Sequence, residues 1–219
     1  MAQQVTLGYW DIRGYAEPIR TLLHYLNVPF KDVRYGFGSG DKFPTNEEWM
    51  KEKFTLDLPF PNLPYLLIDG HCKFTQSVAI LKYFARKHGL VADNPKDQTL
   101  EDMIEGAVTD TRYNLIVAIY YKTYENEAAF QAEMKEVLNG FIAALGNFEK
   151  WIGEKKWLVT DKLSYVDFMA YEYFDWYREF VSADCFSAFP KMAAYMKRFE
   201  ELPSVKAYLT SDGHKKASC

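Results

Sequence analysis

The chain has 219 residues, of which 48% are hydrophobic and 26% charged, a composition typical of a folded globular protein that excludes disordered and fibrous classes. Its formal net charge is -4 and its Lys and Arg residues are scattered, so nucleic acid is not an expected partner. Three cysteines do not make a disulfide framework, and neither a signal segment nor an apolar run long enough to span a bilayer is present. We therefore expect a cytoplasmic protein with no membrane partner.

The first part of the chain alternates between strand and helix signals. Alternating apolar residues over Val5–Trp10 predict a strand, and apolar residues at helical spacing over Ala16–Leu26 predict a helix after it. A second strand is expected over Phe30–Tyr35, followed by a polar loop over Gly36–Asn46.

A hairpin and a helix complete this part of the chain. The Asp69-Gly70 pair lies between two strand-like runs and predicts an antiparallel hairpin. Helical periodicity over Ser77–His88 predicts a helix that ends before a glycine. The resulting order, β-α-β-β-β-α, predicts a thioredoxin-like domain over residues 1–90.

The remainder of the chain has a helical pattern. Residues 91–98 combine Asp, Asn and Pro and predict a linker, and residues 99–219 predict an all-helical bundle domain. The segments with helical periodicity and length in this domain are Leu100–Tyr124, Ala128–Ile152, Ser164–Phe180 and Phe189–Leu202. Ser164 and Asp167 have the spacing of a capping box, so we expect them to act in folding.

The chain lacks the residue patterns that several other kinds of enzyme require. The stretch after the first strand has no Cys-x-x-Cys, which excludes disulfide exchange of the thioredoxin kind. The four histidines lack paired metal-ligand spacing, and no serine lies in a Gly-x-Ser-x-Gly elbow. We therefore expect neither a metal site nor hydrolase activity.

Three segments together resemble the mu-class glutathione transferases, namely Leu7–Gly14, Phe60–Tyr65 and Thr75–Ser77. Each segment alone is a weak match, but their order and spacing are specific. Ser164–Phe168 and Ala188–Pro190 extend the resemblance over nearly the whole chain. The resemblance implies a homodimeric enzyme that conjugates reduced glutathione to hydrophobic electrophiles in detoxification, with glutathione as co-substrate and no cofactor.

Tyr9 is the candidate catalytic residue. The thiol of glutathione has an ordinary pKa of about 8.5, so only a few per cent is the nucleophilic thiolate at pH 7. A hydrogen bond to the anion from a donor that stays protonated would favour the thiolate, and a tyrosine with a pKa near 10 is such a donor. From the pattern alone Tyr9 could also be an ordinary inward-facing strand residue, but the resemblance assigns the activating role to this position.

The resemblance also implies a set of glutathione-binding residues, which are Tyr9, Trp10, Trp49, Lys53, Asn62, Leu63, Gln76, Ser77 and, from the other subunit, Asp110. Lys53 would offer charge and Trp49 its indole N–H to the glycyl carboxylate. A cis proline at Pro64 would expose the backbone of Leu63 to the cysteinyl unit. Gln76 and Ser77 stand at the expected helix start, where an anion is favoured and where capping is the alternative role.

The electrophile site and the dimer contact rest on weaker signals. The resemblance places Trp10, Tyr113 and Tyr120 in the electrophile pocket, although the two tyrosines could simply pack a long helix. Phe60 resembles the residue that the family inserts into a pocket of the partner subunit. The aromatic content of 17% fits either an aromatic core or an apolar ligand pocket. Tyr15, where the family usually has an aliphatic residue, and the short tail after Ser211 depart from the family pattern.

Two alternative functions stay open at this point. The same thiolate would serve a dedicated isomerase or peroxidase, because the thiol machinery does not determine the reaction that follows. A protein of the same fold could also bind apolar ligands without turnover. The presence of Tyr9 argues against the second alternative.

Overall fold

The computed structural model describes residues 3–36, 47–122 and 124–214, without the side chains of Tyr120 and Tyr121. The chain forms two compact units. The first contains the residues up to His88 and those from Pro203 onward, and the second is Gly89–Leu202. Within the described residues, no helix combines the length and the apolar character that crossing a bilayer requires.

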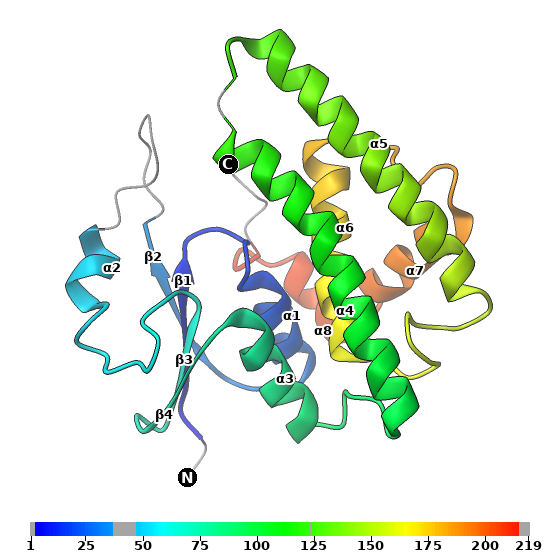
Figure 1. Cartoon of the computed structure of the whole chain (residues 1–219). Coiled ribbons are helices and arrows are strands. Elements are labelled where there is room, and N and C mark those ends of the chain that lie inside the picture. Colours follow the sequence, from blue (N-terminus) through cyan, green and yellow to red (C-terminus); the bar gives the residue numbers. More distant parts are fainter. Residues whose placement is uncertain (1–2, 37–46, 123, 215–219) are drawn as a thin grey trace. The chain divides into compact units, whose positions relative to one another are not determined.

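The first unit is built on a four-stranded mixed sheet in the order β2-β1-β3-β4 (Figure 1). Its strands are β1 (Val5–Trp10), β2 (Lys31–Tyr35), β3 (Tyr65–Ile68) and β4 (Cys72–Thr75). β1 is parallel to β2 and antiparallel to β3, which pairs with β4 in the hairpin. Asp69 and Gly70 have φ values of 52° and 74°, the left-handed conformation that a tight hairpin turn requires. The structure confirms the predicted thioredoxin-like domain.

The helices of this unit are α1 (Glu17–Tyr25), α2 (Glu47–Glu52), α3 (Ser77–Lys87) and α8 (Pro203–Leu209). α1 and α3 pack together on one face of the sheet, and α2 lies on the other side (Figure 1). α8 packs on α1 and buries Val205 and Tyr208. Neither α2 nor α8 was predicted, because six or seven residues are too few for a clear helical period.

The pairing register of the sheet gathers several chain segments at one edge. Gly8 pairs with Tyr65, and Tyr65 pairs with Thr75 on its other side. The residue after Gly8, the residues before Tyr65 and the residues after Thr75 therefore lie at the same end of the strands. Trp10 pairs with Tyr35 of β2 at this end.

The second unit is helical, as predicted. Its elements are α4 (Pro95–Ile116), a π-helical turn η1 (Val117–Tyr121), α5 (Glu127–Ile152), α6 (Tyr165–Phe180) and α7 (Pro190–Glu200). α4 begins at Pro95 because Asn94 caps it and accepts the Asp97 N–H at 3.0 Å. Residues 95–98 of the predicted linker therefore belong to a helix, and the predicted domain boundaries stay a prediction.

Aromatic side chains fill the core of the second unit. Thirteen consecutive residues of α6 are buried, from Tyr165 to Tyr177. Phe141 of α5 stacks on Tyr177 with ring centroids 3.7 Å apart and an interplanar angle of 8°. Phe148 meets Phe174 at 5.0 Å. Much of the high aromatic content is thus used in packing, where each ring buries a large apolar area.

Candidate active site

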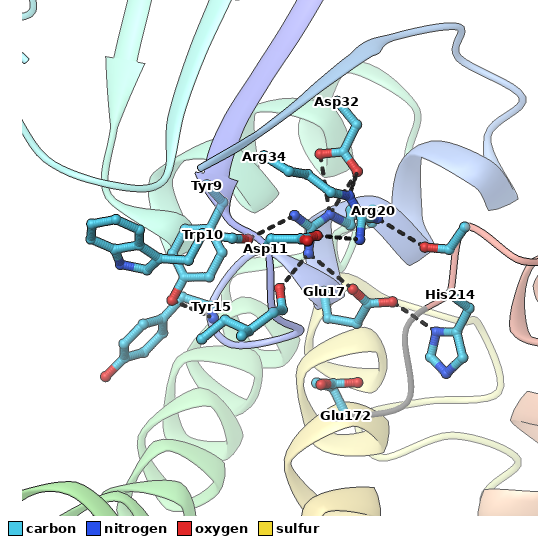
Figure 2. Close-up of polar contacts among 12 residues, drawn as sticks. Tyr9, Trp10, Asp11, Tyr15, Glu17, Arg20, Asp32, Arg34, Glu172 and His214 are labelled. Atoms are coloured by element: carbon cyan, nitrogen blue, oxygen red, sulfur yellow. Dashed lines mark hydrogen bonds and ion pairs between the residues drawn. The ribbon is translucent and has the colours of Figure 1, made fainter. Parts of the chain in front are cut away.

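The candidate thiol-activating residue lies at the edge where the strand ends meet. Tyr9 is near the end of β1 and only 5% exposed. Its hydroxyl oxygen accepts a hydrogen bond from the backbone N–H of Tyr15 at 3.1 Å (Figure 2). This contact fixes the position of the phenol oxygen relative to the loop between β1 and α1.

Gly14 makes that contact possible. Its φ of +48° lies in the left-handed region, which disfavours residues with a side chain. A Cβ atom at this position would lie 2.6 Å from the Tyr9 hydroxyl oxygen. The loop can therefore wrap closely around the Tyr9 phenol only with glycine here.

Arg20 of α1 holds the same loop from the protein interior. The side chain is fully buried, with a relative exposure of 0%. Its guanidinium donates to the carbonyl of Ile12 at 2.8 Å and, more weakly, to that of Trp10 at 3.4 Å. The guanidinium carbon is 6.0 Å from the centroid of the Tyr9 ring. Arg20 thus holds one carbonyl of the loop and, more weakly, the last carbonyl of β1 beside the phenol.

The position of Trp49 is set by a cluster of rings and hydroxyls. Trp49 of α2 stacks on Tyr65 with centroids 5.9 Å apart. The Tyr35 hydroxyl donates to a Glu52 carboxylate oxygen at 2.6 Å and lies 2.9 Å from the Tyr65 hydroxyl. Burial raises the pKa of both Tyr35 and Tyr65, so both hydroxyls stay protonated. The cluster attaches α2 to the sheet.

Lys53, Asn62 and Leu63 are also in the first unit. Lys53 follows α2 and is half-buried, with its ammonium 5.4 Å from the Phe54 ring centroid. The Leu63–Pro64 peptide bond is cis, which confirms that prediction. The N–H of Leu63 donates to Asn62 Oδ1 at 2.9 Å. A ligand that pairs with this N–H would therefore displace the Asn62 oxygen.

Gln76 and Ser77 form the start of α3. Gln76 precedes the helix with a φ of 74° and a ψ of 111°, an uncommon conformation for a residue with a long side chain. Its side chain is exposed and accepts no hydrogen bond from the described helix turn. The first N–H groups of an α-helix have no partner within the helix, so this end offers donors to an anion.

The other predicted site residues belong to α4 and η1 or lie apart on the surface. Asp110 and Tyr113 are exposed on α4, and the side chain of Tyr120 in η1 lies outside the described residues. Phe60 of the first unit is 74% exposed. A cavity of about 400 Å³ lies along α4 and α5, with Asp110 among its lining residues and an apolar wall that includes Ile104, Phe141, Ala144, Phe148 and Trp151.

The sequence-based hypothesis missed three contributors to the site: the Tyr15 N–H, Gly14 and Arg20. Gly14 ends the Leu7–Gly14 motif, and a glycine after a strand is a signal for a special backbone conformation. A backbone donor such as the Tyr15 N–H leaves no signal in residue type. Among the described residues no group of three or more His, Cys, Asp or Glu is placed to hold a metal ion.

Comparisons with known proteins show the family of the chain. The sequence pattern of the glutathione S-transferase N-terminal domain matches residues 5–86, and that of the C-terminal domain matches residues 109–212. Glutathione S-transferase Mu 1 of Oryctolagus cuniculus is 40% identical over 207 residues, which cover 94% of this chain and 91% of the relative. Glutathione S-transferase Mu 1 of Mus musculus is 40% identical over 94% of this chain and 90% of its own length.

A solved structure extends the agreement to three dimensions. The crystal structure of the glutathione S-transferase Blo t 8 superposes with a TM-score of 0.89 at 47% identity, covering 98% of this chain and 95% of that one. The similarity in sequence and the similarity in structure therefore both extend over nearly the whole chain. The chain belongs to the glutathione S-transferase family and, within it, to the mu class.

Proposed function

We propose that this chain conjugates reduced glutathione to hydrophobic electrophiles, as a detoxifying enzyme in which Tyr9 stabilises the glutathione thiolate. Family membership supports the activity. The observation that supports the role of Tyr9 is the geometry of its hydroxyl, which accepts the Tyr15 N–H at the edge where Leu63 and Gln76 also lie.

The energy that this role requires is within the range of one hydrogen bond. Lowering the thiol pKa by about two units takes roughly 2.7 kcal/mol of preference for the anion. A hydrogen bond to a charged acceptor contributes about 1.5–3 kcal/mol. An N–H donated to the phenol oxygen polarises its O–H and makes it a stronger donor, as in other hydrogen-bond chains. The Tyr15 N–H therefore supports the role of Tyr9.

The reaction itself requires no proton from Tyr9. The thiol releases its proton to solvent, and the Tyr9 O–H donates to the resulting sulfur anion. The sulfur electron pair then forms a bond to an electrophilic carbon. In a substitution the leaving group departs with its bonding pair, and in an addition the developing anion takes a proton from solvent. Trp10, Tyr113 and Tyr120 are proposed to line the electrophile pocket.

The tripeptide would be held by the residues at the same edge. Lys53 and Trp49 would bind the glycyl carboxylate, and the backbone of Leu63 would pair with the cysteinyl unit after exchange with the Asn62 oxygen. Gln76 and Ser77 would hold the γ-glutamyl carboxylate at the start of α3. The ammonium would meet Asp110 of the partner subunit, so each site would need two chains.

Mutation of Tyr9 tests the proposal directly. We expect Tyr9→Phe to bind glutathione nearly as tightly as the wild type but to raise the pKa of the bound thiol by about two units, with a loss of turnover of about a hundredfold well below that pKa. A titration followed by the ultraviolet absorbance of the thiolate measures this, and Tyr25→Phe is a matched control on α1. Superimposable titration curves for Tyr9→Phe and wild type would remove Tyr9 from the mechanism.

Two features of the chain support the proposed dimer, namely the exposed Phe60 side chain and the cavity along α4 and α5. An exposed Phe60 suits an apolar cavity of the size found along α4 and α5, and that cavity includes Asp110. We expect Phe60→Ser to raise the dimer dissociation constant at least tenfold, since burial of one aromatic side chain contributes about 1.5–3 kcal/mol. Sedimentation at low concentration tests this, with Phe54→Ser, which changes a similarly exposed phenylalanine, as the control. Unchanged association of Phe60→Ser would exclude the contact.

We also propose that the enzyme acts in the cytosol.

A further inference from the structure

The end of the described chain is attached to the first unit at a place that the proposed mechanism does not use. The carbonyl of Gly213 accepts a hydrogen bond from Arg34 at 2.8 Å. The His214 ring nitrogen Nδ1 lies 2.9 Å from a Glu17 carboxylate oxygen. The Tyr208 hydroxyl donates to the same oxygen at 2.7 Å. The segment Tyr208–His214, here called the C-terminal clamp, thus has three polar attachments.

Glu17 is the residue on which the clamp converges. It is 1% exposed, and its second carboxylate oxygen accepts from Arg20 at 3.2 Å. Burial alone would raise its pKa, but the His214 hydrogen bond, the Arg20 charge and the Tyr208 hydrogen bond outweigh it and lower the pKa to about 2. An ionised carboxylate only accepts hydrogen bonds, so His214 Nδ1 carries the hydrogen.

Charged side chains and the clamp form a closed ring of contacts, and Arg20 of this ring binds the loop of residues 11–16 between β1 and α1, here called the Tyr9 loop. From Arg20 the contacts run to Asp32, with Nε–oxygen distances of 3.3 and 3.1 Å, and from Asp32 to Arg34 at 2.7 Å. Arg34 then binds the Gly213 carbonyl of the clamp. Figure 2 shows this ring, with His214 on one side of Arg20 and Tyr9 on the other.

The carboxylates of the ring determine the orientation of the Arg20 guanidinium. A guanidinium has several donors in a fixed planar fork, so its carboxylate partners determine its orientation. The donors that reach the Ile12 and Trp10 carbonyls belong to the guanidinium that Glu17 and Asp32 orient. Loss of the His214 or Tyr208 donor would leave Glu17 less well fixed and would transfer that freedom through Arg20 to the loop beside Tyr9.

We propose that His214 and Tyr208 are positioning residues for thiol activation, because they fix Glu17 and, through Arg20, the loop that aligns the Tyr9 hydroxyl. The inference rests on the proposed function of Tyr9. It gives the last residues of the described chain a role in chemistry that takes place at the end of β1. A difference of a few tenths of an ångström at the phenol oxygen matters because hydrogen-bond strength depends steeply on geometry.

The test compares four full-length variants by thiolate titration of bound reduced glutathione. We expect His214→Ala to raise the pKa of the bound thiol by about half to one unit, which lowers the thiolate fraction below that pKa about three- to tenfold. Turnover of an aryl halide falls by the same factor near neutral pH, and the loss shrinks at alkaline pH. His214→Asn keeps an N–H near the Nδ1 position and restores most of the wild-type value.

Two further variants make the outcome decisive. Tyr208→Phe removes only the hydroxyl and keeps the ring, whose stack on His24 has a centroid distance of 4.0 Å, so it shifts the thiol pKa in the same direction even if His214→Ala does not fold. Asp212→Ala changes an exposed residue of the same segment and behaves as wild type.

The inference is overturned if Tyr208→Phe and any folded His214→Ala lower thermal stability while the thiol pKa and the pH profile stay unchanged. A wild-type enzyme whose bound thiol is no more acidic than free glutathione would instead contradict the proposed role of Tyr9. The two failures are therefore distinguishable.

Discussion

Two buried carboxylates, one in each unit, lie at the start of a helix and have pKa values shifted in opposite directions. Glu17 begins α1, and its partners are Arg20, His214 and Tyr208. Asp167 lies in the first turn of α6, and its partners are the N–H groups of Ser164 and Leu158 at 2.9 and 3.1 Å and the Tyr195 hydroxyl.

The difference in pKa shows that hydrogen bonds together with an adjacent cation outweigh burial at Glu17, whereas hydrogen bonds alone do not at Asp167. Burial raises the pKa of Asp167 to about 7, and hydrogen bonds from neutral groups only reduce that rise. For Glu17 the His214 hydrogen bond, the adjacent Arg20 charge and the Tyr208 hydrogen bond together reverse the effect of burial. As pH rises from about 4 to about 7, Asp167 therefore contributes less to stability, whereas Glu17 contributes most above pH 4.

The two carboxylates also differ in the groups that they hold in place. Asp167 connects a loop residue, Leu158, to the start of a helix and so serves packing. Glu17 belongs to the closed ring of contacts, and its partner Arg20 donates to the Ile12 carbonyl of the Tyr9 loop. The ion pairs of Glu17 and Asp32 orient the Arg20 guanidinium, whereas the hydrogen bonds of Asp167 to backbone N–H groups hold the chain at the start of α6.

The largest expected effect is at Asp167. Asp167→Ala leaves two buried N–H groups without their acceptor, and each such loss costs about 1–3 kcal/mol, so we expect the free energy of unfolding to fall by about 3 kcal/mol or more. Urea unfolding at fixed protein concentration measures it. Asp184→Ala, an exposed aspartate of the same unit, should stay within about 0.5 kcal/mol of wild type. If Asp167→Ala also changed the free energy of unfolding by only about 0.5 kcal/mol, the two N–H groups would have found other acceptors.

A smaller effect is expected at Glu17, and it depends on pH. Because the folded-state pKa is lowered from 4.5 to about 2, the ionised group stabilises the fold above about pH 4, and this contribution disappears as pH falls toward 2. We expect Glu17→Gln to lower the free energy of unfolding by about 2–3 kcal/mol at pH 7 and by much less near pH 3. Urea unfolding at both values tests this, with exposed Glu47→Gln as the control. A loss equal at both pH values would contradict the ion-pair explanation.

The smallest expected effect comes from an exposed helix cap, whose hydrogen bonds, including one from the Asn94 amide to the Asp97 carboxylate at 2.7 Å, are all open to solvent. Asn94 accepts the Asp97 N–H at the start of α4. We expect Asn94→Ala to lower the free energy of unfolding by about 1 kcal/mol at any pH between 5 and 8, and Asn94→Ser to retain most of it. Thermal and urea unfolding of both variants measure this. If Asn94→Ala lowered the free energy of unfolding as much as Asp167→Ala, burial would not explain the difference expected between the two variants.

The fold was largely predictable because most elements are long enough to have a clear period. β1, α3 and α5 repeat apolar residues at the spacing of a strand or a helix, and their bounds differ from the predicted ones by a residue or less. α2 and α8 are too short for such a period. Where α8 packs depends on a distant partner, α1, which no local pattern reveals.

The candidate site also has features that local sequence predicts and features that it does not. Tyr9, Gln76 and the cis proline lie in motifs whose residue order carries the resemblance. The Tyr15 N–H and the ring from His214 to Arg20 depend on backbone groups and on residues almost two hundred positions apart. Contacts of this kind have no period and no motif.

The sequence by itself determined the family, the order of strands and helices and the identity of the phenol that we assign to the thiol, because these depend on local periods and on motifs of fixed spacing. Only the tertiary structure decided which groups surround that phenol. The Gly14 backbone can approach Tyr9, and the chain end can reach Glu17, only after the sheet and α1 have brought distant segments together. Non-local packing, not residue type, therefore decides how the Tyr9 hydroxyl is held.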